Sequence, residues 1–243
     1  MHRTRAAANH VLAWREPVSR HLPEGPVTLL DVGAGTGVFA TAFADWFDPP
    51  AGTPGGSPGD SPVGILAVEP SAAGRAEVPL HPRIRVIDGH PEALPLPAAC
   101  ADLAWLSRIT HRTRDLGTLA RELHRTMRPG APLLIREVFP ERCARRPLVR
   151  FFPECRRVIN AYPTLERTRA AFAAAGFRDR ALHPVAEWAA ADLAHFTGGL
   201  RRGSNALLRG LSDEEYARGL CRLRGAAPET PVLDHIDLLV LTR

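Results

Sequence analysis

Asp31-Val-Gly-Ala-Gly-Thr-Gly37 is the stretch of this 243-residue chain that decides its fold. The apolar run Val27–Val32 leads into it after a proline, as expected for a buried parallel strand. The glycines turn the chain, and Val38–Phe47 continues with apolar residues spaced along one helical face. A strand, a glycine-rich turn and a helix in this order predict the first βαβ unit of an α/β fold.

Strands and helices continue to alternate after this unit. Further strands are expected at Gly64–Val68, Arg83–Ile87, Ala101–Leu106, Pro132–Val138, Phe177–Val185 and Asp234–Thr242. Helices are expected at Asp115–Arg128, Thr164–Ala175, Glu187–Thr197 and Ser212–Arg224. The pattern predicts a Rossmann-like, seven-stranded, mostly parallel sheet with an antiparallel last strand and helices on both faces.

The segment Asp48–Val63 interrupts this alternation. It is rich in proline, glycine and serine, and it can form neither a helix nor a strand because proline lacks a donor and glycine is costly to order. The α/β pattern resumes directly after it, so residues 48–63 are expected to form a flexible surface insertion and not a linker. The whole chain, 1–243, is therefore predicted to be a single domain.

The composition narrows the class of protein but names no partner. The formal net charge is +5, yet all 31 basic residues are arginine and none is lysine, which indicates a codon preference and not a nucleic-acid partner. The four cysteines are scattered without a ligand pattern, so no metal site is predicted. The chain has no signal-peptide pattern and no long apolar run, so a cytoplasmic protein without a membrane partner is expected.

Glu69 is the second part of the nucleotide-type pattern. It ends the second expected strand, where a carboxylate can accept hydrogen bonds from both hydroxyls of a ribose. It lies 36 residues beyond Gly33, and removal of the 16-residue insertion leaves the spacing of about 20 that is expected for a ribose-binding acid. The glycine loop and this acid together favour a nucleoside cofactor.

A dinucleotide is the alternative ligand for such a loop. Dinucleotide-binding loops have a third glycine at the position that Val38 occupies here. Asp31 precedes the loop, and its charge would repel a pyrophosphate but suit a cationic group. The residues therefore favour a cationic nucleoside over a dinucleotide. A plain strand–helix turn without a ligand is the remaining alternative.

Five blocks of the chain form an ordered set of motifs: Asp31–Gly37, Val68–Ser71, Gly89–Pro97, Asp102–Ser107 and Glu122–Gly130. In this order they resemble the motifs of class I S-adenosylmethionine-dependent methyltransferases, in particular the ubiquinone-biosynthesis-like (type 11) branch. The resemblance covers about residues 27–139. It implies one class I methyltransferase domain over 1–243, with S-adenosylmethionine as cofactor and S-adenosylhomocysteine as product.

The resemblance also implies which residues hold the cofactor. They are Asp31, Gly33, Ala34, Gly35, Gly37, Glu69, Pro70, Asp88, Gly89, His90 and Ser107. His90 stands where the family usually has an aspartate that bonds the adenine. The N-terminal segment also departs from the family, because Asn9, His10 and Trp14 lie where a tyrosine is usual. Both departures leave the strength of cofactor binding open.

His111 is the candidate catalytic residue. Ligands of open α/β sheets bind beyond the carboxyl ends of the strands, and His111 follows the fourth expected strand. An imidazole suits proton removal at neutral pH, which methyl transfer needs when the acceptor must lose a proton. The alternative is that His111 is an ordinary surface residue of an arginine-rich loop.

Acceptor contacts are expected from the segments that follow the cofactor motifs. Residues 139–161 and 187–224 are predicted to form an acceptor-side cap. The candidate substrate-binding residues are Arg108, Arg136, Arg150, Phe151 and Phe152. Arginines can bind carboxylates or phosphates, and phenylalanines can wall a pocket. A solvated arginine face is the alternative.

Methylation of a small molecule, such as a natural-product scaffold, is the function that we expect from the sequence, by a monomer or a homodimer. Nucleic-acid methylation is less expected: it would need a basic face with aromatic stacking platforms or a target-base motif such as Asn-Pro-Pro-Tyr, and no such motif occurs here. A methyltransferase-like fold that binds the cofactor and catalyses a non-methylating reaction is a third class, because a fold does not determine a reaction.

Overall fold

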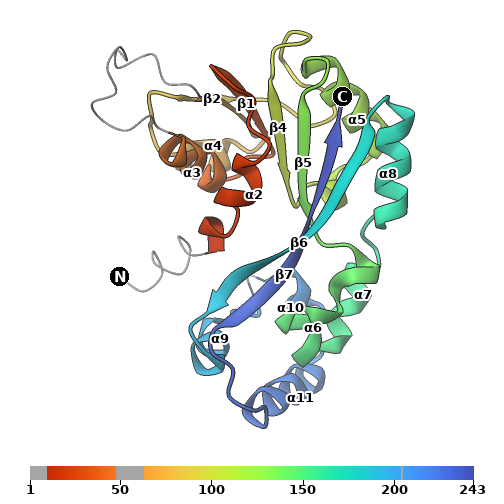
Figure 1. Ribbon diagram of the computed structural model, residues 1–243. Helices are drawn as coiled ribbons and strands as arrows, with labels where there is room; N and C mark the ends of the chain where they lie inside the picture. The colour runs from red at the N-terminus through yellow and green to blue at the C-terminus, as the bar shows by residue number, and fades with distance from the viewer. Residues whose placement is uncertain (1–9, 48–62, 204) are drawn as a thin grey trace. The chain divides into compact units, whose positions relative to one another are not determined.

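The computed structural model describes residues 10–47, 63–203 and 205–243 (Figure 1). Contacts between residues divide the chain into two compact units. Unit 1 comprises Met1–Trp14, Val138–Leu165 and Pro184–Asp237, and unit 2 comprises Arg15–Glu137, Glu166–His183 and Leu238–Arg243. Each unit therefore combines segments that lie far apart in the sequence. The single domain over 1–243 stays a prediction. The predicted insertion lies outside the described residues except for Val63.

The strands form one seven-stranded sheet in the order β3-β2-β1-β4-β5-β7-β6. They are β1 (Val27–Val32), β2 (Val63–Val68), β3 (Ile84–Ile87), β4 (Leu103–Ser107), β5 (Pro132–Glu137), β6 (Arg178–Ala190) and β7 (Val232–Thr242). The pairs β1–β2, β2–β3, β1–β4 and β4–β5 are parallel, and β6 runs opposite to β7 (Figure 1). The predicted Rossmann-like, mostly parallel sheet is confirmed.

Short and medium helices accompany these strands. The α-helices are α2 (Arg15–Ser19), α3 (Val38–Trp46), α4 (Ala72–Glu77), α5 (Leu116–Thr126), α6 (Pro147–Phe151), α7 (Arg156–Ile159), α8 (Leu165–Ala174), α9 (Leu193–Gly199), α10 (Ala206–Arg209) and α11 (Asp213–Arg224). The 3-10 helices are η1 (Thr110–Arg112), η2 (Pro140–Arg145) and η3 (Pro153–Cys155). In the described part of the chain, no helix has the length and apolar character that crossing a membrane requires.

The boundary between β6 and α9 differs from the prediction. The expected helix Glu187–Thr197 is wrong at its start, because β6 continues to Ala190. Val185 and Glu187 are buried while Ala186 between them is exposed, which is the alternation of a strand. Glu187 is accommodated inside because its carboxylate accepts a hydrogen bond of 2.8 Å from the Trp14 indole. The helix starts only after Asp192, which caps it by accepting from the backbone N–H of His195.

The core of unit 2 is built around Trp105 on β4. Its ring lies 4.9 Å from Phe39 and 5.4 Å from Phe43, both on α3, and all three side chains are buried. Tilted and edge-on aromatic contacts of this kind add to the stabilisation from burial alone. They fix α3 against the sheet, and therefore fix the glycine loop from which α3 starts.

The core of unit 1 contains Phe152, which is completely buried. Its ring stacks on Tyr216 of α11 with 5.5 Å between the centroids. A Cβ placed on Gly219 would lie 2.0 Å from this ring, so the helix backbone approaches the ring as closely as a glycine allows. Two bidentate ion pairs, Arg142 with Asp237 and Arg146 with Asp234, join the segment that follows β5 to β7.

Candidate functional site

The glycine loop after β1 takes a backbone shape that favours glycine. Gly33, Gly35 and Gly37 have φ angles of 73°, 58° and 75°, in the left-handed region. The backbone N–H groups of Gly33 and Ala34 donate to the carbonyl of Val68 at the end of β2, at 2.8 and 3.1 Å. A Cβ on Gly35 would meet no atom within 4 Å. The loop therefore faces open space at Gly35, as a ligand-binding turn requires.

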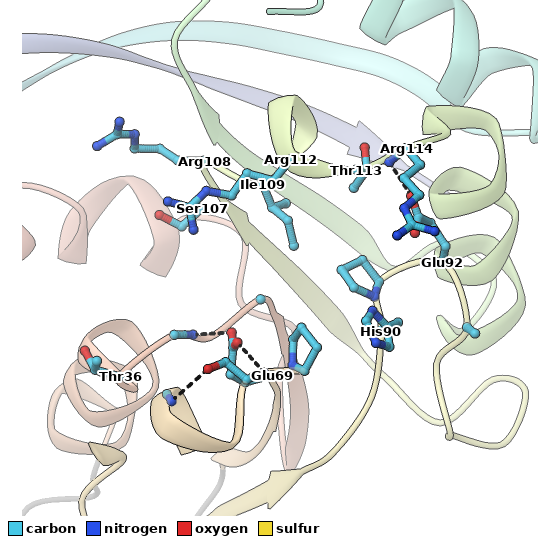
Figure 2. Close-up of a pocket in the computed structure, with 17 residues that line it drawn as sticks. Thr36, Glu69, His90, Glu92, Ser107, Arg108, Ile109, Arg112, Thr113 and Arg114 are labelled. Carbon is cyan, nitrogen blue, oxygen red and sulfur yellow. Dashed lines mark hydrogen bonds between the residues drawn. The ribbon is translucent and has the colours of Figure 1, made fainter. Parts of the chain in front are cut away.

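Glu69 lies directly after β2 and supports this loop (Figure 2). Its Oε2 accepts a hydrogen bond from the backbone N–H of Gly35 at 2.9 Å, and its Oε1 accepts one from Ser71 at 2.9 Å. A carboxylate oxygen has further lone pairs, so each oxygen can still accept from a ligand hydroxyl. The sequence assigned the glycine loop and this acid to one site, and in the structure the two are joined by a hydrogen bond.

Asp31 is a buried carboxyl group beneath the loop. Its side chain is 2% exposed, and among the described residues its Oδ2 has no hydrogen-bond partner. Burial raises the pKa of Asp31 to about 7, and the charge of Glu69 adds to this rise. A buried and unpartnered polar atom destabilises the fold. A cationic group that reached Asp31 would relieve this cost.

A pocket of about 800 Å³ opens over the loop, within the range of small-molecule sites. All of its lining residues belong to unit 2. They are Gly33, Gly35, Thr36, Glu69, Pro70, Ser71, Gly74, His90, Pro91, Glu92, Ala93, Ser107, Arg108, Ile109, Arg112, Thr113 and Arg114. Figure 2 shows Glu69 on one side of the pocket, Ser107, Arg108 and Ile109 on another, and His90 and Glu92 on a third, with Arg114 beside Glu92.

The wall that contains His90 is held in place by α5. The backbone N–H of Leu94 donates to Glu122 at 2.8 Å. The guanidinium of Arg125 donates to the carbonyls of Leu96 and Leu94 at 2.7 and 2.9 Å, and it also pairs with Glu122. Glu122 and Arg125 belong to the block Glu122–Gly130 of the sequence, and this clamp is the structural role of those two residues.

Only part of the predicted cofactor set lines the pocket. The lining members are Gly33, Gly35, Glu69, Pro70, His90 and Ser107, and the remaining ones are Asp31, Ala34, Gly37, Asp88 and Gly89. Asp88 is exposed, and its carboxylate forms a bidentate ion pair with Arg75 at 2.9 and 2.8 Å. Arg75 also donates to the carbonyls of Glu69 and Pro70, so Asp88 supports, through Arg75, the pocket wall around Glu69. The cofactor roles of all these residues stay predictions.

Several lining residues were missed by the sequence analysis. Ser71 caps α4, a helix that the sequence did not predict, by accepting from the backbone N–H of Gly74. A serine is a common N-cap residue, so Ser71 was the available signal for the start of this helix. Ile109 packs over Gly33, since a Cβ on Gly33 would lie 2.3 Å from its Cδ1. Arg108 was predicted as a substrate-binding residue, but its positive φ of 55°, which is rare for a residue with a side chain, was not. No local pattern indicates such a conformation.

His111 and Glu137 form a second polar cluster close to this pocket. Nδ1 of His111 lies 3.3 Å from Oε1 of Glu137, which is completely buried. The hydroxyl of Thr110 donates to Oε2 of Glu137 at 2.6 Å. His111 does not line the pocket, although Arg112 and Thr113 beside it do. Its catalytic role stays a prediction.

The predicted substrate residues fall into both units. Arg136 is buried in unit 2, where it donates to the Ser107 hydroxyl at 3.2 Å and lies 5.4 Å from the ring centre of Phe39. In unit 1, Arg150 forms an ion pair with Glu229 and lies over the ring of Phe151, and Phe152 is a core residue. Arg108 is the member of the set that lines the pocket. A role of these residues in substrate binding stays a prediction.

The family model described as methyltransferase domain matches residues 3–182, which is most of the chain. The search of curated proteins found no match. Among solved structures, a protein from Anabaena variabilis assigned as a methyltransferase of an antibiotic biosynthesis pathway is similar, with a TM-score of 0.65 and 18% identity. The alignment covers 96% of this chain and 97% of that one.

Two further solved structures share the fold. The S-adenosylmethionine-dependent methyltransferase from Mesorhizobium loti has a TM-score of 0.55 and 17% identity, over 95% of this chain and 98% of its own. The (4+2)-cyclase SpnF has a TM-score of 0.61 and 19% identity, over 94% of this chain and 80% of its own. At these identities the likeness concerns the fold alone.

Proposed function

This chain belongs to the methyltransferase domain family, and on that premise we propose that it transfers a methyl group from S-adenosylmethionine to a small-molecule acceptor. One observation carries the proposal. Asp31 and Glu69 are acidic groups at the ends of neighbouring parallel strands; the glycine loop follows the strand that contains Asp31, and Glu69 accepts a hydrogen bond from Gly35 of this loop. This arrangement offers a cationic nucleoside two carboxyl groups and a close approach to the backbone.

The residues present fit this cofactor. Glu69 would accept hydrogen bonds from the ribose hydroxyls, and the wall around His90 would lie against the adenine. Gly35, where a side chain would project into open space, would let the backbone approach the ligand. Asp31, whose Oδ2 has no partner among the described residues, would face the ammonium group. When bound, the cofactor supplies an electrophilic methyl group on a sulfonium.

The protein's contribution to such a reaction is mainly orientation. Methyl transfer is an in-line displacement, so the enzyme must align the acceptor with the sulfonium and exclude water. We propose a small-molecule acceptor handled by a monomer or a homodimer in the cytoplasm, without a membrane or nucleic-acid partner. The pocket, of about 800 Å³, is of the size that small ligands occupy.

A non-methylating reaction is the second candidate. It is favoured by one observation, the similarity of the fold to the (4+2)-cyclase SpnF. In that case the cofactor would bind without losing its methyl group. Methylation of nucleic acids is the third and less favoured candidate.

Two measurements test the proposal. In calorimetry, the protein should bind S-adenosylmethionine and S-adenosylhomocysteine but not NAD; binding of NAD alone would refute the cofactor assignment. Protein supplied with methyl-labelled S-adenosylmethionine is then incubated with a fractionated small-molecule extract or with RNA and DNA. Label in a small molecule supports the proposal, and label in nucleic acid supports the third candidate. Cofactor binding without label transfer supports the second.

A further inference from the structure

One buried carboxylate next to the pocket wall has no part in the cofactor assignment above. Glu137 is the last residue of β5, and its side chain contacts η1, the turn after β4. Its Oε2 accepts hydrogen bonds from the backbone N–H of Thr110 at 3.2 Å and from the Thr110 hydroxyl at 2.6 Å. Its Oε1 lies 3.3 Å from Nδ1 of His111. A single carboxylate thus contacts three groups of one short segment.

This segment forms part of the pocket. Ile109 and Arg112, which lie on either side of Thr110 and His111, are both lining residues (Figure 2). Ile109 is also packed closely over Gly33 of the glycine loop. The contacts of Glu137 therefore hold in place the pocket wall that packs on the glycine loop.

The same contacts determine the chemistry of the His111 ring. With Glu137 ionised, its carboxylate only accepts hydrogen bonds, and Nδ1 then carries the hydrogen of the contact with Oε1. In a neutral imidazole the other nitrogen, Nε2, then carries the lone pair. A carboxylate that orients a histidine in this way is the usual partner of a histidine that takes up a proton.

We propose that Glu137 is a positioning residue that holds His111 as the Nδ1–H tautomer, so that Nε2 accepts the proton that the acceptor group loses. The inference rests on the proposed methyl transfer. The acceptor oxygen or nitrogen forms its bond to the methyl carbon, while the electron pair of the broken carbon–sulfur bond stays on sulfur. The acceptor's proton passes to Nε2, and the Glu137 carboxylate offsets the charge of the resulting imidazolium.

A spectroscopic measurement tests the tautomer without cofactor or acceptor. Long-range proton–nitrogen NMR on protein with ¹⁵N-labelled histidine, assigned through a His111→Asn variant, distinguishes the two ring nitrogens at about pH 8, where imidazoles are mostly neutral. We expect the Nδ1–H form in the wild type. An Nε2–H form in the wild type would overturn the proposal, and this outcome needs no variant to fold.

Glu137→Gln separates positioning from simple support of the loop. The glutamine oxygen can still accept from Thr110, while its NH₂ group donates to Nδ1 and should shift His111 to the Nε2–H form. Glu137→Asp, which keeps the charge, should retain the Nδ1–H form. Glu77→Gln, an exposed acid of the same unit, is the matched control and should resemble the wild type. An unchanged tautomer in a folded Glu137→Gln protein would contradict a positioning role.

Chemical modification tests whether Nε2 accepts an electrophile as a base would. Diethyl pyrocarbonate reacts with the unprotonated nitrogen, and mass spectrometry locates the product. We expect modification of His111 in the wild type and its loss in Glu137→Gln, with the exposed His183 modified in both. Because the His111 side chain is only 11% exposed, the comparison between the two proteins decides: His111 modified to the same extent in the wild type and in Glu137→Gln would contradict the proton-acceptor role.

Binding of S-adenosylhomocysteine is measured in parallel. If the wild type fails to bind it, the proposed function is wrong, whatever the tautomer. If it binds with an Nε2–H His111, the function stands and the role of Glu137 does not.

Discussion

The carboxylate of Glu69 accepts a hydrogen bond of 2.9 Å from the backbone N–H of Gly35. The contact joins the residue after β2 to the loop after β1, and these two strands are parallel neighbours in the sheet. Hydrogen bonds to a charged acceptor are stronger than neutral ones. Glu69 therefore shapes the loop as well as presenting acceptor oxygens to the pocket, and its substitution should affect both.

Glu69→Gln should weaken binding of S-adenosylhomocysteine. Loss of charge-assisted hydrogen bonds should cost about 1.5–3 kcal/mol, which is roughly 10- to 150-fold in the dissociation constant. Calorimetry on the variant measures this effect, and Glu77→Gln, which lies outside the pocket lining, serves as the control. An unchanged affinity would place the ribose elsewhere.

Asp31 should make the stability of the protein depend on pH. Burial raises its pKa from 3.8 to about 7, so the folded state binds this proton more tightly than the unfolded chain does. Its contribution is therefore fully present below 3.8 and is lost as the pH rises towards about 7. An Asp31→Asn variant should not lose stability in this way, because asparagine does not titrate. The melting temperature of the variant relative to the wild type should increase with pH, and a constant difference would contradict the assignment.

The same carboxyl group should make cofactor binding depend on pH. An ammonium group binds better to the ionised form of Asp31, so the affinity for S-adenosylhomocysteine should rise as the pH increases through about 7. 5′-Methylthioadenosine lacks the ammonium group and provides the control ligand, with an affinity that should vary less. Calorimetry at several pH values measures the affinity for both ligands. Equal pH dependence of both ligands would show that Asp31 does not meet the ammonium group.

Gly35→Ala should reduce cofactor binding far more than it reduces stability. Both Gly35 and Gly130 have positive φ, of 58° and 82°, and neither has an atom within 4 Å of an added Cβ. Both alanine variants should therefore lose about 1 kcal/mol of folding free energy through backbone strain. Only Gly35 lines the pocket, so only its variant should lose affinity. Denaturant titrations and calorimetry on the pair test this. Equal losses of affinity would mean that the effect is strain alone.

Gly219→Ala should destabilise the core of unit 1. The added Cβ would lie 2.0 Å from the Phe152 ring, and overpacking of a core typically costs about 1–3 kcal/mol. Gly198→Ala is the matched control, because Gly198 is also helical but its Cβ would meet nothing within 4 Å. That variant should be neutral or slightly stabilised. Thermal unfolding that ranks the two variants in the opposite order would contradict the close packing of α11 on Phe152.

The sheet and the glycine loop were predictable because their signals are local or periodic. The spacing between Gly33 and Glu69 could be interpreted because parallel strands bring their carboxyl ends to the same edge. The extension of β6 was not predictable, since the burial of Glu187 depends on Trp14, which lies far away in the sequence.

The arrangement around His111 shows where the sequence stops being informative. The sequence placed His111 after the fourth expected strand and Glu137 near the end of the fifth, but it could not show that one carboxylate holds both Thr110 and His111. Nor could it show that Oδ2 of Asp31 lacks a hydrogen-bond partner among the described residues, or that Arg75 forms an ion pair with Asp88. These are properties of packing, which no residue pattern along the chain encodes.

The clamp between α5 and the wall around His90 has a kinetic consequence. The amide hydrogen of Leu94 and the carbonyls of Leu94 and Leu96 are held by Glu122 and Arg125, at the last turns of the helix. Freeing the amide of Leu94 thus requires disruption of a charge-assisted cluster, and not only the fluctuation of a loop. In hydrogen–deuterium exchange, this amide should therefore exchange as slowly as those near the end of α5. The wall would then open together with the helix end, as one cooperative element.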